Sequence, residues 1–341
     1  MKIAVVGLGA VGGLIAGRLA RAGYSVSAVA RGATLQAVQR DGLQVRIDGT
    51  SWQSPIEASA DPRALGPHDL VVLALKGPAL IDVAPTLAPL IGKQTTVLPA
   101  MNGVPWWFLG AGADASRSAR SPRLDAPLAS VDPAGTIAAA LPFAQVLGCV
   151  VHLSCSSPAP GVVQHGFGNR LIVGEPRGGA SARTDQVCAA LAKAGFTAEP
   201  STDIRADIWY KLWGNMTTNP ISALTGATTD RILDDPDVHA FMLRAMAEAA
   251  AVGAKIGCPI AQSGEARMAV TRQLGSFKTS MLQDALAARP LELDALVAVV
   301  AEIGARVGVE TPNIGALLGL TRLMARERGL YPRDKAAAAR S

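Results

Sequence analysis

The sequence contains little cysteine, and the cysteines it has are scattered. The four cysteines form no CxxC pair or other metal-ligand spacing, and the four histidines are equally dispersed. No apolar run approaches the ~20 residues of a membrane-spanning helix. The chain opens on a strand pattern without a signal-peptide layout. These absences argue against a disulfide-stabilised secreted protein, a membrane protein and a metal enzyme. We expect a cytoplasmic protein with reduced thiols and no metal.

Aromatic and charged residues are also sparse, at 4% and 17% of the 341 residues. No basic stripe interleaves with aromatic side chains, which argues against nucleic-acid binding. The net charge of +5 suits an enzyme with anionic ligands. Hydrophobic residues make up 49% of the chain, and its length favours two domains because single cores stop growing near ~250–300 residues.

A glycine-rich turn follows the first apolar run. Residues 2–6 predict a strand, and a helical pattern continues to residue 22. Between them stands the turn Gly7, Leu8, Gly9, Ala10, Val11 and Gly12. Gly7 permits a tight turn, Gly9 lets the backbone approach a pyrophosphate, and Gly12 lets the helix pack closely on the strand. This context predicts a dinucleotide site rather than an ordinary glycine-containing turn.

The second strand, residues 25–30, is followed by Arg31. An NAD enzyme usually places Asp or Glu here to bind the adenosine ribose 2′-hydroxyl. The acid is missing, and a guanidinium suits a 2′-phosphate. The sequence therefore predicts NADP(H) as cofactor, and the alternative is that Arg31 is an ordinary surface arginine.

Two further strands deliver polar residues to one edge of the predicted sheet. Lys76 follows the apolar run 69–75, and Asn102 comes soon after the strand at 95–98. Because open α/β sheets bind ligands at the carboxyl ends of their strands, we expect a cofactor role rather than plain loop positions.

The remaining pattern outlines two domains. Residues 43–47 meet Asp48-Gly49, a hairpin signal. Further elements are expected as a helix at 85–91, strands at 146–153, 162–165, 171–173 and 196–199, and a helix at 184–194. Only helices follow Pro200, which predicts an α/β domain at 1–200 and a helical domain at 201–331. We expect residues 110–134 to form an extended surface loop and 332–341 a disordered tail.

The first helix of the second domain carries an unusual polar face. Lys211, Asn215 and Asn219 recur at i, i+4 and i+8, where a solvated helix would usually carry Glu, Gln and Lys. Pro220 disfavours helical geometry at Asn219 and could turn that amide out of the helix. Since asparagine is a poor helix former, its repetition favours hydrogen bonding to a ligand. A helix with a mildly polar edge is the alternative.

Two long helical patterns follow, at 237–256 and 260–274. Pro290 suits the first position of another helix, which would put Glu292 in its first turn. A carboxylate is favoured there by the helix dipole, so a structural role explains Glu292 as well as a functional one.

With these residues in view, the chain resembles the ketopantoate reductase (2-dehydropantoate 2-reductase) family over nearly its whole length. The blocks that carry the likeness are GLGAVGG at 7–13, Arg31, LALK at 73–76, MNG at 101–103, IRADIWYKLWGN at 204–215, NP at 219–220, SMLQD at 280–284 and LELD at 291–294. The resemblance implies an N-terminal Rossmann domain, a C-terminal helical domain, NADPH, a 2-oxo acid substrate and a place in pantothenate biosynthesis.

The resemblance also implies roles for single residues. Lys211 resembles the catalytic lysine and Glu292 its acidic partner at the cofactor. Asn102 matches an asparagine at the nicotinamide and substrate, while Lys76 and Ser154 match cofactor-binding positions. The remaining substrate-binding positions, which would hold the carboxylate and hydroxyl of the substrate, are Asn215, Asn219 and Ser280.

One departure concerns the substrate. The family often has a further substrate-binding asparagine beyond the NP pair, whereas residues 225–229 read TGATT and would offer threonine hydroxyls instead. The loop at 110–134 is also longer than in compact members. A reductase of a different 2-oxo or 3-oxo acid therefore stays open as an alternative. A nucleotide sensor without turnover is a further, less favoured alternative.

The sequence leaves the oligomeric state open, with a homodimer as one alternative.

Overall fold

The computed structural model describes residues 1–110 and 126–332, which divide into two compact units. The first contains residues 1–110 and 132–208, and the second contains residues 126–131 and 209–332. The division falls inside one helix, α7 (Ile204–Thr225). Most of the predicted loop and nearly all of the predicted tail lie outside the described residues. No helix among the described residues is long and apolar enough to cross a membrane.

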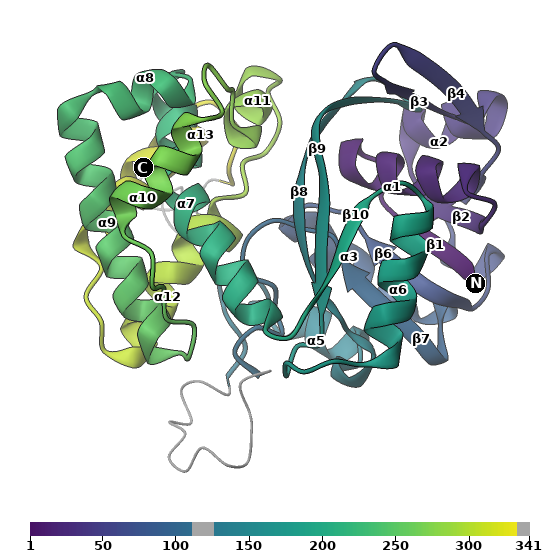
Figure 1. The fold of residues 1–341 in the computed structure, drawn as a ribbon. Coiled ribbons are helices and arrows are strands. Elements are labelled where there is room, and N and C mark those ends of the chain that lie inside the picture. The colour runs from purple at the N-terminus through teal and green to yellow at the C-terminus, as the bar shows by residue number, and fades with distance from the viewer. Residues whose placement is uncertain (111–125, 333–341) are drawn as a thin grey trace, which may run out of the picture. The chain divides into compact units, whose positions relative to one another are not determined.

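The first unit contains a parallel sheet with the strand order of a Rossmann fold (Figure 1). Its order is β5-β2-β1-β6-β7, and every neighbouring pair is parallel. The strands are β1 (Lys2–Val6), β2 (Ser25–Val29), β5 (Glu57–Ser59), β6 (His68–Leu73) and β7 (Ile91–Pro99). The order reverses between β1 and β6, which is where open sheets of this kind bind ligands. The predicted Rossmann fold is confirmed.

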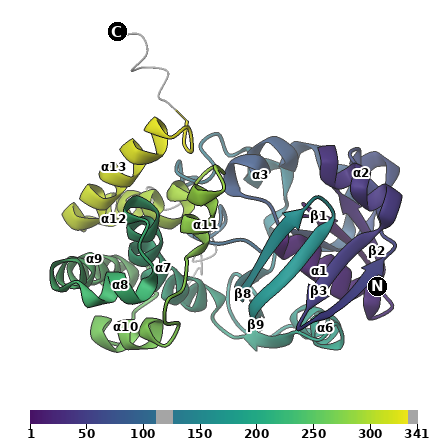
Figure 2. The ribbon, with the colours of Figure 1, turned by 90° about the horizontal axis from the view of Figure 1, so that it is seen from above.

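A second sheet lies across helix α1 from the first (Figure 2). Its strands are β3 (Leu43–Ile47), β4 (Thr50–Ser54), β8 (Gly148–Ala159), β9 (Val162–Gly174) and β10 (Thr197–Ser201). The predicted hairpin joins β3 to β4 through Asp48 and Gly49, with φ of 47° and 77°. Both angles are left-handed, as the tightest hairpin turns require.

The two short strands predicted at 162–165 and 171–173 are parts of one strand, β9. Its partner β8 also runs further than predicted, to Ala159. Gly166 and Gly168 interrupt the apolar pattern of β9, and Gly168 has φ of 76°. Because glycine in a strand usually marks a bulge, the sequence pattern breaks where the hydrogen-bonded ladder continues. The β8–β9 register does shift near Ser154.

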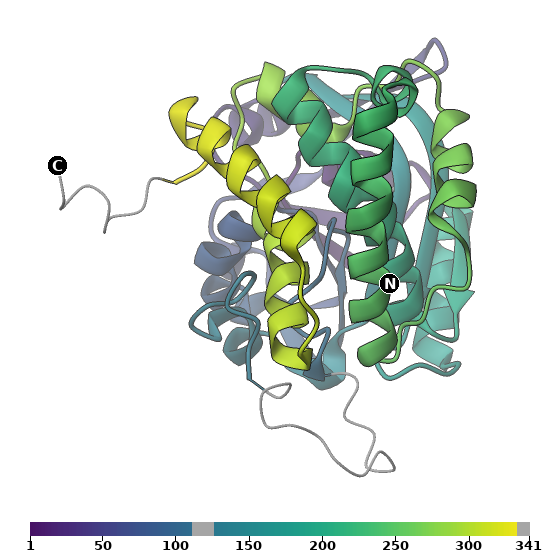
Figure 3. The same cartoon turned by 90° about the vertical axis from the view of Figure 1, so that its left-hand side faces the viewer.

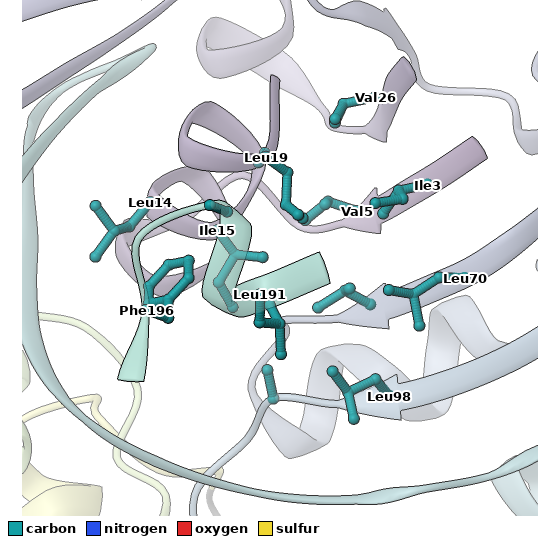
Figure 4. Close-up of a cluster of buried hydrophobic side chains, with 14 of the residues drawn as sticks. Ile3, Val5, Leu14, Ile15, Leu19, Val26, Leu70, Leu98, Leu191 and Phe196 are labelled. Carbon is teal, nitrogen blue, oxygen red and sulfur yellow. The ribbon is translucent and has the colours of Figure 1, made fainter. Parts of the chain in front are cut away.

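The core of the first unit is built around α1 (Ala10–Arg21). Leu14, Ile15 and Leu19 pack with Ile3 and Leu70 in one buried cluster (Figure 4). A Cβ atom at two glycines of α1 would overlap the second sheet, at Val163 for Gly13 and at Val45 for Gly17. The glycines therefore let a helix pack tightly between two sheets. The other helices of the unit are α2 (Gly32–Asp41), α3 (Gly77–Val83), α5 (Thr136–Ala140) and α6 (Ala182–Lys193).

The helix predicted at residues 85–91 does not form, so this prediction is wrong. Helix α3 ends at Val83, and two short 3₁₀ turns, η2 (Ala84–Thr86) and η3 (Ala88–Leu90), follow it. Each turn contains a proline, which lacks a backbone N–H and clashes with the preceding helical turn.

The second unit is helical (Figure 3). Beyond α7 its elements are α8 (Thr229–Asp234), α9 (Pro236–Lys255), α10 (Gly264–Arg272), α11 (Ser280–Leu286), the π-helix η6 (Asp294–Ala298), α12 (Val299–Val307) and α13 (Pro312–Glu327). Helix α13, yellow in Figure 3, packs on α9, α12 and η6.

Two expectations about this unit are wrong. Helix α7 does not turn at Asn219 but continues through Pro220 to Thr225. Although a proline inside a helix costs about 3 kcal/mol, Met216 and Ile221 are buried on either side and favour the helical path. Pro290 does not begin a helix either, because helical geometry starts only at Leu293.

Candidate functional site

A pocket of about 340 Å³ opens in the first unit at the carboxyl ends of β1 and β2. It is lined by Val6, Gly7, Leu8, Gly9, Val29, Ala30, Arg31, Thr34, Ala60, Leu75, Asp82, Val83, Thr86 and Ser157. The pocket thus gathers four predicted cofactor residues: three from the glycine turn, and Arg31. Ala10, Val11 and Gly12, the second half of the turn, are the first residues of α1.

The three glycines of the turn differ in what the protein requires of them. Gly7 has φ of 96°, and an added Cβ would lie 2.7 Å from the carbonyl oxygen of Ala74. At Gly12 it would overlap the carbonyl oxygen of Gly7. At Gly9 an added Cβ would meet no heavy atom within 4 Å. Packing therefore explains the first two glycines but not Gly9, whose bare backbone faces the pocket and fits the close approach of a pyrophosphate.

The N-terminus of α1 suits the same group. Its N-cap residue, Gly9, has no side chain that could cap the helix. No acidic residue lies in the first turn. The first backbone N–H groups of a helix lack internal partners and carry positive partial charge. They can therefore bind an anion at the edge of the pocket. The residues present fit the pyrophosphate of a dinucleotide.

Arg31 lies at the end of β2, exposed at the pocket rim, and is the N-cap residue of α2. Thr34, in the first turn of α2, lines the pocket beside it. A guanidinium and a hydroxyl together suit a phosphate, and no carboxylate stands at this strand end. The carboxylate that does line the pocket, Asp82, comes from α3.

The role of Gly9 can be separated from that of Gly12 by substitution. We expect Gly9→Ala to keep the thermal unfolding midpoint but to weaken NADPH binding by about tenfold or more, because the methyl group would project into the pocket. Gly12→Ala should lower the unfolding midpoint, since its Cβ overlaps backbone. Unchanged NADPH affinity, measured by fluorescence titration of Gly9→Ala, would contradict this account of the turn.

Lys76 and Asn102 follow neighbouring parallel strands. Lys76 is the N-cap residue of α3, just after β6, and Asn102 comes soon after β7. The strands pair up to Leu73 and Pro99, so both residues do follow the same sheet edge. Both are half-buried, and neither is among the residues that line the pocket. Ser154, on β8, is half-buried and also outside the lining, which contains Ser157 instead.

The second unit presents the polar face of α7 as predicted. Lys211, Asn215 and Asn219 lie on one unbroken helix, the first two half-buried and Asn219 only 5% exposed. The opposite side of α7 is anchored on α9. The indole N–H of Trp209 donates to the carbonyl oxygen of Ala249 at 3.3 Å, and that of Trp213 donates to Met246 at 2.7 Å. These bonds fix the rotation of α7.

A half-buried cation, Arg267, also lies against α7. A Cβ atom added at Gly214 would lie only 2.6 Å from Nη2 of Arg267, so the guanidinium packs directly on this glycine. The guanidinium also stacks over the ring of Tyr210. Burial lowers the pKa of this guanidinium. Tyr210 and Gly214 immediately precede Lys211 and Asn215. Arg267 comes from α10, and the sequence offers no spacing that would connect it to α7.

The threonine hydroxyls of residues 225–229 all donate hydrogen bonds within the protein. Thr225 donates its hydroxyl to Ile221 O at 2.7 Å, and Thr228 donates to the Asp230 carboxylate at 2.5 Å. Thr229 is 1% exposed and donates to Gly275 O at 2.6 Å. None therefore has a free donor to offer a substrate. The hydroxyls that the sequence offers in place of an asparagine amide therefore donate within the protein.

Ser280 and Glu292 belong to the same unit. Ser280 is exposed at the start of α11, whose N-cap is the buried Thr279. Glu292 is half-buried and immediately precedes the first helical residue, Leu293. Among residues 1–110 and 126–332, no group of three or more His, Cys, Asp or Glu side chains could hold a metal ion.

The sequence missed several pocket residues. Thr34 could have been found, because it lies one helical turn after Arg31. Asp82, Thr86 and Ser157 could not, because they come from α3, η2 and β8 and only the fold brings them to the glycine turn.

Comparison with known proteins gives consistent matches over both units. The family model described as ketopantoate reductase PanE/ApbA matches residues 3–106, and the model of its C terminal part matches residues 203–325. A 2-dehydropantoate 2-reductase of Mesorhizobium japonicum is 42% identical over 333 residues, which cover 97% of this chain and 100% of that protein.

Solved structures are similar to this chain over nearly its whole length. A protein of Ralstonia solanacearum MolK2, named as a candidate ketopantoate reductase, is 57% identical with a TM-score of 0.91, over 97% of this chain and 99% of that one. A PanE/ApbA family ketopantoate reductase of Ralstonia eutropha JMP134 is 26% identical with a TM-score of 0.80, over 96% of this chain and 100% of that one.

Proposed function

The chain belongs to the ketopantoate reductase PanE/ApbA family, and from that premise we propose that it reduces 2-dehydropantoate (ketopantoate) to pantoate with NADPH. The observation that carries the proposal is the lysine and two asparagines on one face of α7, in a chain whose other unit holds a dinucleotide pocket. A protein that only sensed nucleotides would need the pocket but not this face.

The first unit binds the cofactor. The glycine turn and the N-terminus of α1 hold the pyrophosphate, and Arg31 with Thr34 holds the 2′-phosphate. Lys76 adds a positive charge for the cofactor at the next strand end, Ser154 contributes from β8, and Asn102 contacts the nicotinamide and substrate. When bound, NADPH supplies a hydride from C4 of its nicotinamide to the ketone carbon.

The second unit supplies the proton and holds the substrate. As the hydride bonds to the carbon, the π electron pair of the C=O bond moves to oxygen. The Lys211 ammonium stabilises that developing charge and then donates its proton, which leaves the alcohol and a neutral amine that regains a proton from water. Glu292 orients the ammonium. Asn215, Asn219 and Ser280 bind the carboxylate and hydroxyl of the substrate.

One assay tests this proposal. NADPH oxidation is followed at 340 nm against ketopantoate and a matched panel of 2-oxo and 3-oxo acids, including 2-oxoisovalerate, which lacks the terminal hydroxyl. We expect the highest kcat/KM for ketopantoate. An absence of ketopantoate turnover, alongside efficient turnover of another acid, would overturn the substrate and keep the reaction class.

A reductase of a different 2-oxo or 3-oxo acid is the second candidate. It is supported by the threonines at 225–229, whose hydroxyl protons are all donated to protein oxygens. The loss of one neutral hydrogen bond to the substrate is worth ~0.5–1.5 kcal/mol, or roughly two- to tenfold in kcat/KM. That is too little to abolish ketopantoate reduction. A homodimer and a cytoplasmic location also stay predictions.

A further inference from the structure

Glu292 lies between two hydrogen bonds to the end of the described chain, which we call the C-terminal segment (residues 330–332). On one side, the backbone N–H of Leu291 donates to the carbonyl oxygen of Leu330 at 2.9 Å. On the other, the hydroxyl of Tyr331 donates to Oδ1 of Asp294 at 2.6 Å. The residues between these two bonds, 291 and 292, lie outside the helix that Pro290 was expected to begin.

The C-terminal segment is itself firmly held. The N–H of Leu330 donates to Ala325 O at 2.7 Å, and the Leu330 side chain is 3% exposed. The ring of Tyr331 stacks against two guanidinium groups of α13, at 5.8 Å from Arg322 and 5.7 Å from Arg326. The two bonds that flank Glu292 therefore end on residues that are themselves held by contacts within the unit.

The Tyr331–Asp294 bond has a defined direction at neutral pH. Burial, and then the bond to Asp294, raises the pKa of Tyr331 to about 12, so its hydroxyl keeps the proton that it donates. Burial also raises the pKa of the Asp294 carboxyl, while Tyr331, Arg322 and Arg326 act in the opposite direction. A hydrogen bond to a half-buried carboxylate is among the stronger kinds.

Asp294 also begins the π-helix η6, which continues into α12. Isolated π turns are rare and occur often at functional sites. Here the π turn begins two residues after Glu292. The bond from Tyr331 is made to its first residue.

We propose that Tyr331 and Asp294 are positioning residues that hold the backbone at Glu292, and so its carboxylate, in place for the reaction. The inference rests on the proposed function, because it assigns Glu292 a role beside Lys211. It adds a residue pair from the end of the chain to that role. Displacement of a catalytic group by about 1 Å can cost around a hundredfold in rate, so a loosened Glu292 should be measurable.

The test is a double-mutant cycle. Tyr331→Phe keeps the ring between the two arginines and removes only the hydroxyl. We expect it to lower kcat about tenfold in the native background but less than about twofold in a Glu292→Gln background, because the effect acts through Glu292. An equal loss in both backgrounds, or no loss in the native one, would overturn the proposal.

The conservative variant at the other end of the bond is Asp294→Asn, which can still accept from Tyr331. It should keep more activity than Asp294→Ala. Tyr24→Phe, on a tyrosine of the first unit, serves as the control and should leave kcat unchanged. Equal losses for Asp294→Asn and Asp294→Ala would mean that the hydrogen bond is not what matters.

A second measurement does not depend on turnover. Hydrogen exchange at the amides of residues 291–294 should accelerate in Tyr331→Phe and not in Tyr24→Phe. If ketopantoate is not a substrate, the cycle is run with the acid that is turned over, so that failure of the substrate assignment is separate from failure of the positioning. Unchanged exchange at 291–294 would overturn the proposal even in an inactive protein.

Discussion

Lys211→Ala lowers kcat for ketopantoate by roughly a hundredfold or more if Lys211 is the proton donor, the usual scale for a lost general acid or oxyanion donor. NADPH binding and the thermal unfolding midpoint should persist, because the cofactor pocket lies in the other unit and α7 is anchored on α9 by Trp209 and Trp213. Steady-state kinetics and a fluorescence titration of NADPH measure both quantities.

Two comparisons sharpen this experiment. Lys211→Arg keeps the positive charge, but the guanidinium stays protonated and cannot act as an acid. It should recover part of the oxyanion stabilisation and little of the proton transfer. Lys255→Ala, at the exposed end of α9, is the matched control and should have native kinetics. Near-native kcat in Lys211→Ala would reduce Lys211 to an edge residue of its helix.

Arg31→Ala should weaken NADPH binding about ten- to a hundredfold and change NADH binding little. The variant removes a charge-assisted contact to the 2′-phosphate that is worth ~1.5–3 kcal/mol, and NADH has no such phosphate. Dissociation constants for the two cofactors measure the difference.

Arg40→Ala is the control for this prediction. Arg40 lies on the same helix, α2, but is exposed and paired with its neighbour Asp41 at 2.6 Å, outside the pocket lining. It should leave both affinities unchanged. If the native enzyme used NADH and NADPH with equal efficiency, the assignment of Arg31 to a 2′-phosphate would not stand.

Local signals in the sequence were sufficient for the elements that carry the candidate site, where those elements are continuous in the chain. The strand, the glycine turn and α1 follow each other within residues 2–21, and their backbone requirements leave few alternatives. The face of Lys211, Asn215 and Asn219 needed only helical periodicity. Its continuation past Pro220 was not predictable, because the burial of Met216 and Ile221 depends on neighbouring helices.

Features set by distant parts of the chain were not visible in the sequence. The β8–β9 pairing overrides the glycines that break the pattern of β9. Leu291, the neighbour of Glu292, donates a hydrogen bond to Leu330, which lies beyond the end of α13. The Thr229 hydroxyl is committed to Gly275, far along the chain, so no local pattern could have shown that it is unavailable.

The packing of α1 between two sheets has a consequence for synthesis on the ribosome. Val163 packs on α1 at Gly13, and Val45 packs on it at Gly17. Val45 belongs to β3, which pairs in parallel with β9, a strand that is synthesised much later. At about 5–20 residues per second, about 7 to 30 seconds separate the emergence of α1 from that of β9. Until β9 emerges, the face of α1 at Gly13 lacks the partner that covers it in the folded protein, Val163. We infer that this interval is when the nascent chain depends most on chaperones.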